Sequence, residues 1–328
     1  MSLTSQLDQK NSPVSMFFRQ YESGEGIKEC LAALQSSKRV IPPPYEPSSR
    51  SVWGFIGTTT DYLIRYVANS NQLDLNKTIA HEAVFYANDG PALLPLLPLK
   101  QRETVNALWN IGGMYLNGRR PDESVVYSAT ALSMLDNVFR SGGRLPRSFD
   151  EPLAPAEREM IGTVSAGYDE NEKEAMVRFY GYFCNTLGGA PYTQDILTTL
   201  DTFSSAIINP NDEMTDAKIS TFNSALANSH TVGGADFDCV ITKGGARILT
   251  DIKTTIKPLP ANALRQLIGY ALLHEPQMDG FDFDHMGIYF SRSGSFRYLP
   301  TKEVFQRCFP SLKTLEAAKA TFFDEIQP

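Results

Sequence analysis

The most regular pattern of apolar and polar positions in this sequence lies between residues 236 and 253. Two runs of β-forming apolar residues, Val240-Ile241 and Ile248-Leu249, stand on either side of a Gly244-Gly245 pair. Glycine suits the backbone of a two-residue hairpin turn, and β-branched residues suit strands. The pattern therefore predicts two antiparallel strands joined at the glycine pair.

The turn also predicts which polar side chains share one face of this hairpin. A two-residue turn places residue 238 opposite 251 and residue 236 opposite 253. Side chains alternate along a strand, and cross-strand partners point the same way. The residues at these positions are Asp236, Asp238, Asp251 and Lys253. We expect all of them on a single patch of the sheet.

Such a patch predicts a divalent cation. Crowded carboxylates repel one another, and Mg²⁺ or Mn²⁺, which favour oxygen ligands, would remove that repulsion. A neighbouring lysine can orient or help to deprotonate a water, and it can stabilise charge on a phosphoryl oxygen. The alternative is a solvent-exposed hairpin face with ordinary charges. The apolar residues between the acids disfavour it, because such strands are usually buried on at least one face.

A pattern with helical spacing follows the hairpin at once. Residues 260–274 form an amphipathic stretch entered through prolines, which predicts a helix. Gln266 and Tyr270 are one turn apart on this helix and share a face. Together with a helix expected over 57–70, it should flank a mixed sheet of four or five strands.

The rest of the chain predicts an α/β fold, α+β in a looser vocabulary, with a large helical part. We expect residues 1–50 to form an N-terminal arm that ends in a proline-rich linker, and residues 51–328 to form the main domain. Within that domain, 76–225 is mainly helical and predicts an insertion, while 226–300 holds the core. One helix of the insertion carries aromatic residues at helical spacing and should end at Gly188-Gly189, and such stripes are usually core.

Composition limits the class of protein. A chain of 328 residues with 42 % hydrophobic content can bury a large core. The sequence has no apolar run of about 18 residues and no signal peptide, so we expect a cytoplasmic protein that does not enter a membrane. The cysteines are scattered without metal-binding spacing, which argues for reduced thiols and against zinc. They are Cys30, Cys184, Cys239 and Cys308.

The net charge of −7 bears on nucleic-acid binding. Nonspecific DNA binding rests on Lys and Arg contacts to phosphates, and no polybasic run is present. Local basic stretches occur at Lys100-Gln-Arg102 and Arg119-Arg120. The excess of acidic over basic residues suggests that the protein binds DNA in a restricted way, or that a partner protein supplies the affinity for DNA.

Taken in order, these residues resemble the PD-(D/E)XK nuclease superfamily, in particular its RecB-like branch. The motifs that carry the resemblance are Asp238, then Asp251-Ile-Lys253, then Gln266-x-x-x-Tyr270. Upstream, Gly57-Thr58-Thr-Thr-Asp61 resembles the branch's first motif, with Asp61 where histidine is usual. The resemblance implies a restriction-endonuclease-like mixed central sheet flanked by helices.

The resemblance also implies a metal centre. Asp238 and Asp251 would hold one or two Mg²⁺ or Mn²⁺ ions, with a backbone carbonyl from Thr250 or, as is common in the family, Ile252. Asp236 would be a supporting acid outside the ligand set. Some relatives hold an iron–sulfur cluster through clustered C-terminal cysteines. That set is absent here, so we expect no iron–sulfur cluster.

The remaining motif residues would act around this metal centre. Lys253 would position or activate the water, and Gln266 would orient the lysine or the nucleophile. Tyr270 would touch the DNA backbone or pack behind Gln266.

The third carboxylate has two candidates. Asp61 holds the place of the family's histidine, but Thr58-x-x-Asp61 also matches a capping box, in which Asp61 would only cap a helix. Glu82 is the other candidate ligand. The alternative is that Glu82 is an ordinary solvent-facing residue on a helix.

The function that follows is a divalent-metal-dependent deoxyribonuclease, in DNA repair or in bacterial or phage defence. The alternative is a catalytically silent nuclease-like module that binds nucleic acid or a partner protein. The presence of both acids and the lysine argues against the alternative.

Overall fold

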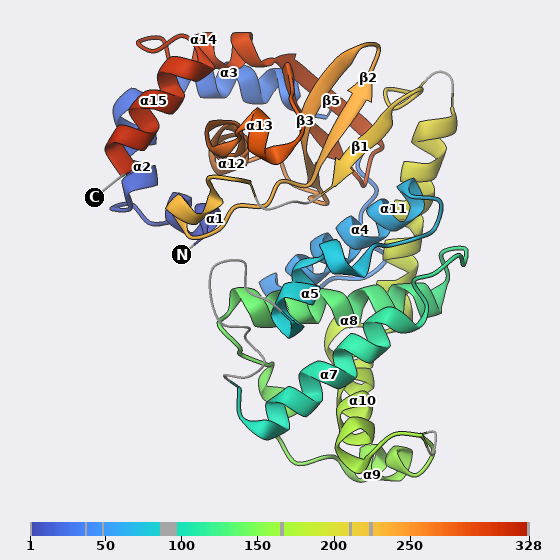
Figure 1. The fold of residues 1–328 in the computed structure, drawn as a ribbon. Helices are drawn as coiled ribbons and strands as arrows, with labels where there is room; N and C mark the ends of the chain where they lie inside the picture. Colours follow the sequence, from blue (N-terminus) through green and yellow to red (C-terminus); the bar gives the residue numbers. More distant parts are fainter. Residues whose placement is uncertain are drawn as a thin grey trace. The chain divides into compact units, whose positions relative to one another are not determined.

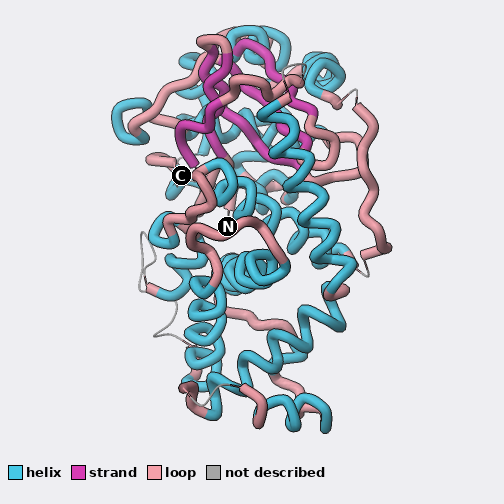
Figure 2. Tube along the Cα trace, turned by 90° about the vertical axis from the view of Figure 1, so that its right-hand side faces the viewer, coloured by secondary structure: helices cyan, strands magenta, loops and turns pink. Residues whose placement is uncertain are grey.

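The computed structural model describes residues 2–36, 38–47, 49–85, 97–164, 167–209, 212–222 and 226–326. The chain forms two compact units. Residues Met1–Pro42 and Thr202–Pro328 form one, which we call the sheet unit, and Pro43–Asp201 form the other, which we call the helical unit. The five strands belong to the sheet unit, and the described part of the helical unit contains helices and loops. Figure 2 shows the strands gathered in one part of the chain.

The fold is α/β, as expected, and is built on a five-stranded mixed sheet with the order β1-β2-β3-β4-β5 (Figure 1). Strands β3 and β4 are parallel, and the other neighbouring pairs are antiparallel. A parallel pair needs a crossover, which the chain between β3 and β4 supplies as a helix. The strands are β1 (Lys218–Phe222), β2 (Cys239–Lys243), β3 (Ala246–Lys253), β4 (His285–Phe290) and β5 (Ser295–Pro300).

The hairpin between β2 and β3 has the expected turn and register. Gly244 and Gly245 both have positive φ angles, 56° and 87°, as a type I′ turn requires. Lys243 pairs with Ala246, and the ladder runs outward to Cys239 and Thr250. The next position outward places Asp238 opposite Asp251, as the arithmetic of the turn predicts.

Helices cover both faces of the sheet. The crossover helix α12 (Ala261–Leu273) buries Leu264 and Leu267 in one core with Val240, Leu249 and Met286, which share a face of the sheet. On the other face, Phe203 from α11 (Ala190–Ile208) packs edge-on against Tyr289, with ring centroids 5.5 Å apart. The helix expected over 260–274 is therefore confirmed, and it lies on the face that carries Asp251.

The N-terminal residues are not an arm, contrary to expectation. Their apolar side chains recur at helical spacing and pack into the core of the sheet unit, where Leu3, Phe17, Phe18 and Ile27 are at most 3 % exposed. They pack there with the C-terminal helices. The helices concerned are α1 (Leu3–Asp8), α2 (Pro13–Tyr21), α3 (Gly24–Leu34), α14 (Thr301–Cys308) and α15 (Leu315–Ile326).

The helical unit begins earlier and ends earlier than the expected insertion over 76–225. The helix expected over 57–70 belongs to the helical unit. Residues 41–47, the proline-rich linker, lack regular structure and contain the boundary between the units. The helices are α4 (Arg50–Ala68), α5 (Ile79–Val84), α7 (Leu99–Met114), α8 (Glu123–Arg140), α9 (Pro155–Ile161), α10 (Glu170–Tyr182) and most of α11. Short helical turns join them at Leu75–Lys77 and Arg147–Phe149.

Helix α10 continues as a π-helix, Phe183–Leu187, and ends at Gly188, which has a left-handed backbone with φ 105°. The end expected at Gly188-Gly189 is thus confirmed. Two short elements complete the sheet unit, Ser229–Val232 and α13 (Pro276–Asp279).

The packing of α3 yields a prediction. A Cβ added at Gly26 would lie 1.9 Å from the carbonyl oxygen of Arg307 in α14, whereas one at Gly24 would meet nothing within 4 Å. Backbone atoms cannot move aside cheaply. We expect Gly26→Ala to lower the free energy of unfolding by about 1–3 kcal/mol, and Gly24→Ala to leave it nearly unchanged. Equal urea midpoints for the two variants would contradict the close contact of α3 with α14.

His274, at the end of α12, yields a prediction about pH. Burial lowers the pKa of this imidazole, which packs on Phe281 and Phe283. Because the folded pKa lies below the unfolded value of about 6.5, the unfolded chain takes up the proton first as the pH falls. The contribution of neutral His274 to the free energy of unfolding is therefore complete above the unfolded pKa of about 6.5. It is lost as the pH falls from there through the folded pKa. Urea unfolding between pH 8 and 5 should show a smaller loss for His274→Gln than for wild type. Exposed His230→Gln should behave like wild type.

Candidate functional site

Four predicted site residues meet in the sheet unit at the end of strand β3. The Nζ of Lys253 lies 2.7 Å from Oδ2 of Asp251 and donates a hydrogen bond to Oε1 of Gln266 at 3.1 Å. Nε2 of Gln266 in turn donates to the Tyr270 hydroxyl at 2.5 Å. Strand β3 and helix α12 thus hold a continuous chain of polar contacts from the buried acid to the tyrosine.

Asp238 joins this cluster from the residue before β2. Its Oδ2 accepts a hydrogen bond from the backbone N–H of Ile252 at 2.6 Å. In a strand, the N–H and C=O of one residue point to the same side. The Ile252 carbonyl therefore also points toward the side on which Asp238 lies, where the β2–β3 ladder has ended. The acid and the backbone oxygen therefore face the same side of strand β3.

The electrostatics of the cluster are set by the burial of Asp251. Its side chain is 2 % exposed, while that of Lys253 is 23 % exposed. Burial by itself would lower the pKa of Lys253, but the charges of Asp251 and Asp238 outweigh it and raise the pKa above its ordinary value. Lys253 is therefore an ammonium at neutral pH. It can hold a phosphate oxygen or orient a water, and it is not a base in this state.

Tyr270 is held in its neutral form. Burial, and then the nearby charges of Asp251 and Asp238, raise its pKa well above the usual value for tyrosine. The phenol consequently keeps its proton and stays a hydrogen-bond donor. Asp236 contributes to the same shift more weakly than the other two acids. Its place as a supporting acid stays a prediction.

The donor atoms of the cluster fit a hard divalent cation. Two carboxylates and a backbone carbonyl are all oxygen donors, and Mg²⁺ bound by one or two carboxylates usually keeps several waters. Within the described ranges, no three His, Cys, Asp or Glu side chains are grouped as metal ligands. Asp238, Asp251 and the Ile252 carbonyl would offer oxygen ligands to such an ion, with further ligands from water or substrate.

The two candidates for a third carboxylate both belong to the helical unit. Asp61 lies on α4 and forms an ion pair with Arg65 one turn later, and Arg65 also lies over the Tyr62 ring at 4.8 Å. The capping-box alternative for Asp61 is wrong, because α4 begins at Arg50 and Thr58 donates to the Gly54 carbonyl inside the helix. Glu82 lies on α5. The role of either acid as a ligand stays a prediction.

Sequence reasoning missed the contribution of the N-terminal helices to this site. The Thr4 hydroxyl accepts a hydrogen bond from Nε2 of Gln266 at 3.4 Å, and Glu22 accepts one from Nε of Arg265 at 2.8 Å. These pairs join residues more than 240 positions apart in sequence. No local pattern could reveal them. The apolar residues at helical spacing within the first 34 positions are a signal of packing that the arm prediction overlooked.

Neither models of known protein families nor curated proteins provide a match for this chain. None of the helices that the structure describes combines the length and apolarity needed to span a bilayer. The fold and the cluster therefore define the class of protein only as an α/β protein with a carboxylate–lysine site on its sheet.

The buried pair of Asp251 and Lys253 yields a prediction that does not depend on activity. Removing the ammonium with Lys253→Met deprives the buried Asp251 carboxylate of this opposite charge, which should lower the free energy of unfolding by about 3–5 kcal/mol. The double variant Asp251→Asn/Lys253→Met should recover most of that loss. Lys302→Ala, at an exposed lysine of the same unit, should unfold like wild type. A double variant no more stable than Lys253→Met would contradict the pairing.

Proposed function

We propose that this protein is a divalent-metal-dependent nuclease that hydrolyses phosphodiester bonds in DNA, of the PD-(D/E)XK type. The observation that carries the proposal is the position of the Lys253 ammonium. It lies between Asp251 and Gln266, and Asp238 adjoins the same strand end. The motif residues between Asp238 and Tyr270, which the resemblance singles out, therefore lie close together in the sheet unit.

The topology of the sheet supports the same proposal. Three antiparallel strands lead into helix α12, and α12 leads into β4, which is parallel to β3. This is a mixed sheet with a flanking helix directly after the catalytic hairpin, the arrangement implied by the resemblance. The restriction-endonuclease-like assignment remains part of the proposal.

The residues of the chain have defined tasks in such a reaction. A bound Mg²⁺ or Mn²⁺ would supply an activated water and neutralise charge on the phosphate. Lys253 donates to a phosphoryl oxygen or orients the attacking water, since it is charged at neutral pH. Gln266 holds Lys253 through its carbonyl oxygen, and the Tyr270 hydroxyl holds Gln266. Each side chain is thereby fixed before substrate arrives.

The proposed setting is the cytoplasm, in DNA repair or in bacterial or phage defence. With a net charge of −7, DNA affinity rests on local basic groups or on a partner protein. A silent module that binds nucleic acid or a partner protein is the alternative, and the experiments below separate it from the enzyme.

Asp238→Asn should abolish DNA cleavage. The asparagine oxygen can still accept from the Ile252 N–H, so the local fold stays while the charge is lost. Plasmid and linear DNA would be incubated with Mg²⁺, Mn²⁺ or EDTA, and cleavage should require the metal. The matched control is Asp282→Asn, at a half-exposed acid that also accepts a backbone N–H. Wild-type cleavage rates in Asp238→Asn would contradict the assignment.

Metal binding can be tested apart from cleavage. Because a bound ion removes repulsion between Asp238 and Asp251, millimolar Mg²⁺ or Mn²⁺ should raise the Tm of wild type by mass action. The rise should be much smaller in Asp251→Asn. Calcium should stabilise the fold without supporting turnover, since its looser coordination positions the water poorly. A Tm rise without any cleavage of DNA would favour the silent module, and equal rises in both proteins would exclude a metal at this site.

A further inference from the structure

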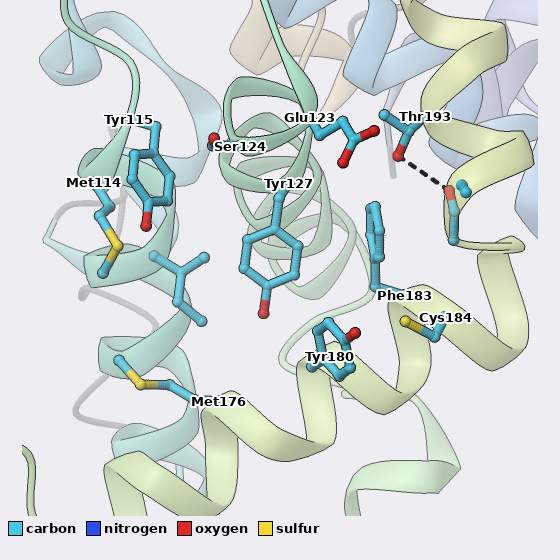
Figure 3. Close-up of a pocket in the computed structure, with 13 residues that line it drawn as sticks. Met114, Tyr115, Glu123, Ser124, Tyr127, Met176, Tyr180, Phe183, Cys184 and Thr193 are labelled. Carbon is cyan, nitrogen blue, oxygen red and sulfur yellow. Dashed lines mark hydrogen bonds between the residues drawn. The ribbon is translucent and has the colours of Figure 1, made fainter. Parts of the chain in front are cut away.

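The helical unit contains a pocket of about 520 Å³ that the proposed nuclease site does not use. Helices α7, α8 and α10, the π-helix and the start of α11 form its walls (Figure 3). This volume lies in the range of small-molecule sites, about 300–1,000 Å³. The pocket is thus large enough for an organic ligand and belongs to one unit.

The walls of the pocket are mainly aromatic and apolar. Tyr127 lies at its centre in Figure 3, with its ring 5.2 Å from that of Phe183 in an edge-on arrangement and 6.4 Å from that of Tyr180. Tyr115 and the thioether of Met176 line the same space. Tyr180 is 46 % exposed. The aromatic stripe expected to be core is buried at Phe179 and Phe183, whereas Tyr180 borders the pocket and is partly open to solvent.

Charge in the pocket comes from one acid. Of the described residues that line it, Glu123 is the one with a carboxylic acid side chain, and none is basic. Figure 3 shows its carboxylate pointing toward the side formed by Phe183 and Thr193. It has no ion pair or hydrogen bond with any described residue. Glu123 begins α8, which spans Glu123–Arg140, and acidic side chains are common in the first turn of a helix.

Two further features indicate a ligand site. Burial raises the pKa of Tyr127, so its hydroxyl keeps a proton to donate, and no described residue hydrogen-bonds that hydroxyl. Phe183 and Cys184 line the pocket from the π-helix. Single π-helical turns frequently occur at functional sites.

We propose that this pocket binds a small organic cation, a protonated or quaternary amine with an aromatic or alkyl body. Aromatic faces attract cations, and the Glu123 carboxylate neutralises the charge. Met176 and Phe183 contact the apolar body, and the Tyr127 hydroxyl remains available for a polar atom. A ligand with a phosphate or carboxylate would face Glu123 without any basic residue to balance it.

Three probes of nearly the same shape test the charge preference. Benzyltrimethylammonium is the cation, neopentylbenzene its neutral isostere, and phenylmethanesulfonate an anion. Cys184 reports binding, because it is partly exposed while the other three cysteines are buried. The rate at which iodoacetamide alkylates Cys184 would be followed by mass spectrometry at increasing probe concentration. The cation should protect Cys184 at about tenfold lower concentration than the isostere, and the anion should not protect.

The variant Glu123→Gln separates charge from shape. It should reduce the preference for the cation over its isostere to about twofold, as expected when only the aromatic faces remain. Glu159→Gln, at an exposed acid on α9 of the same unit, should keep the full preference. The proposal is overturned if cation and isostere protect equally in wild type, if Glu123→Gln keeps the preference, or if millimolar cation gives no protection. Circular dichroism would verify that both variants fold.

Discussion

A buried carboxylate is the constraint on which the site depends. Asp251 is almost fully enclosed between the sheet and α12, and an enclosed charge is stable only when an opposite charge and hydrogen bonds compensate it. Lys253, two residues along the same strand, points to the same face and supplies the compensation. Its own position is then held by Gln266, and that of Gln266 by Tyr270 and Thr4. The position of each side chain follows from that of its neighbour.

The sheet unit is assembled from the two ends of the chain. Its N-terminal helices pack with α12 and the C-terminal helices, while the chain between residues 43 and 201 forms a unit of its own. The contacts of Arg265 with Glu22 and of Gln266 with Thr4 tie the start of α12 to the N-terminal helices. A site on α12 therefore depends on residues that a nuclease core defined by 226–300 would omit.

The two sites proposed for this protein differ in their chemistry. The cluster in the sheet unit offers oxygen donors and an ammonium, which suit a hard cation and a phosphate. The pocket in the helical unit offers aromatic faces and a single carboxylate, which suit an apolar organic cation. The pocket lies within the helical unit, and the cluster of Asp238, Asp251, Lys253, Gln266 and Tyr270 lies within the sheet unit.

The sequence by itself determined the features that depend on neighbouring residues. The glycine pair sets a two-residue turn, and the turn sets the register that brings Asp238 opposite Asp251. Helical spacing likewise places Gln266 and Tyr270 on one face of α12. These are consequences of backbone geometry within a few residues, so they can be worked out before the fold is known.

Tertiary structure decided everything that depends on packing between distant segments. The length of α4 is one example, because Thr58 and Asp61 match a capping box but lie inside a helix that begins at Arg50. The burial of Asp251 is another, since it requires α12 to cover the sheet. The pocket around Tyr127 is a third, because its walls come from helices whose order in sequence does not show which faces meet. Such contacts are set by the complementary shapes of whole elements, which no local pattern of residues encodes.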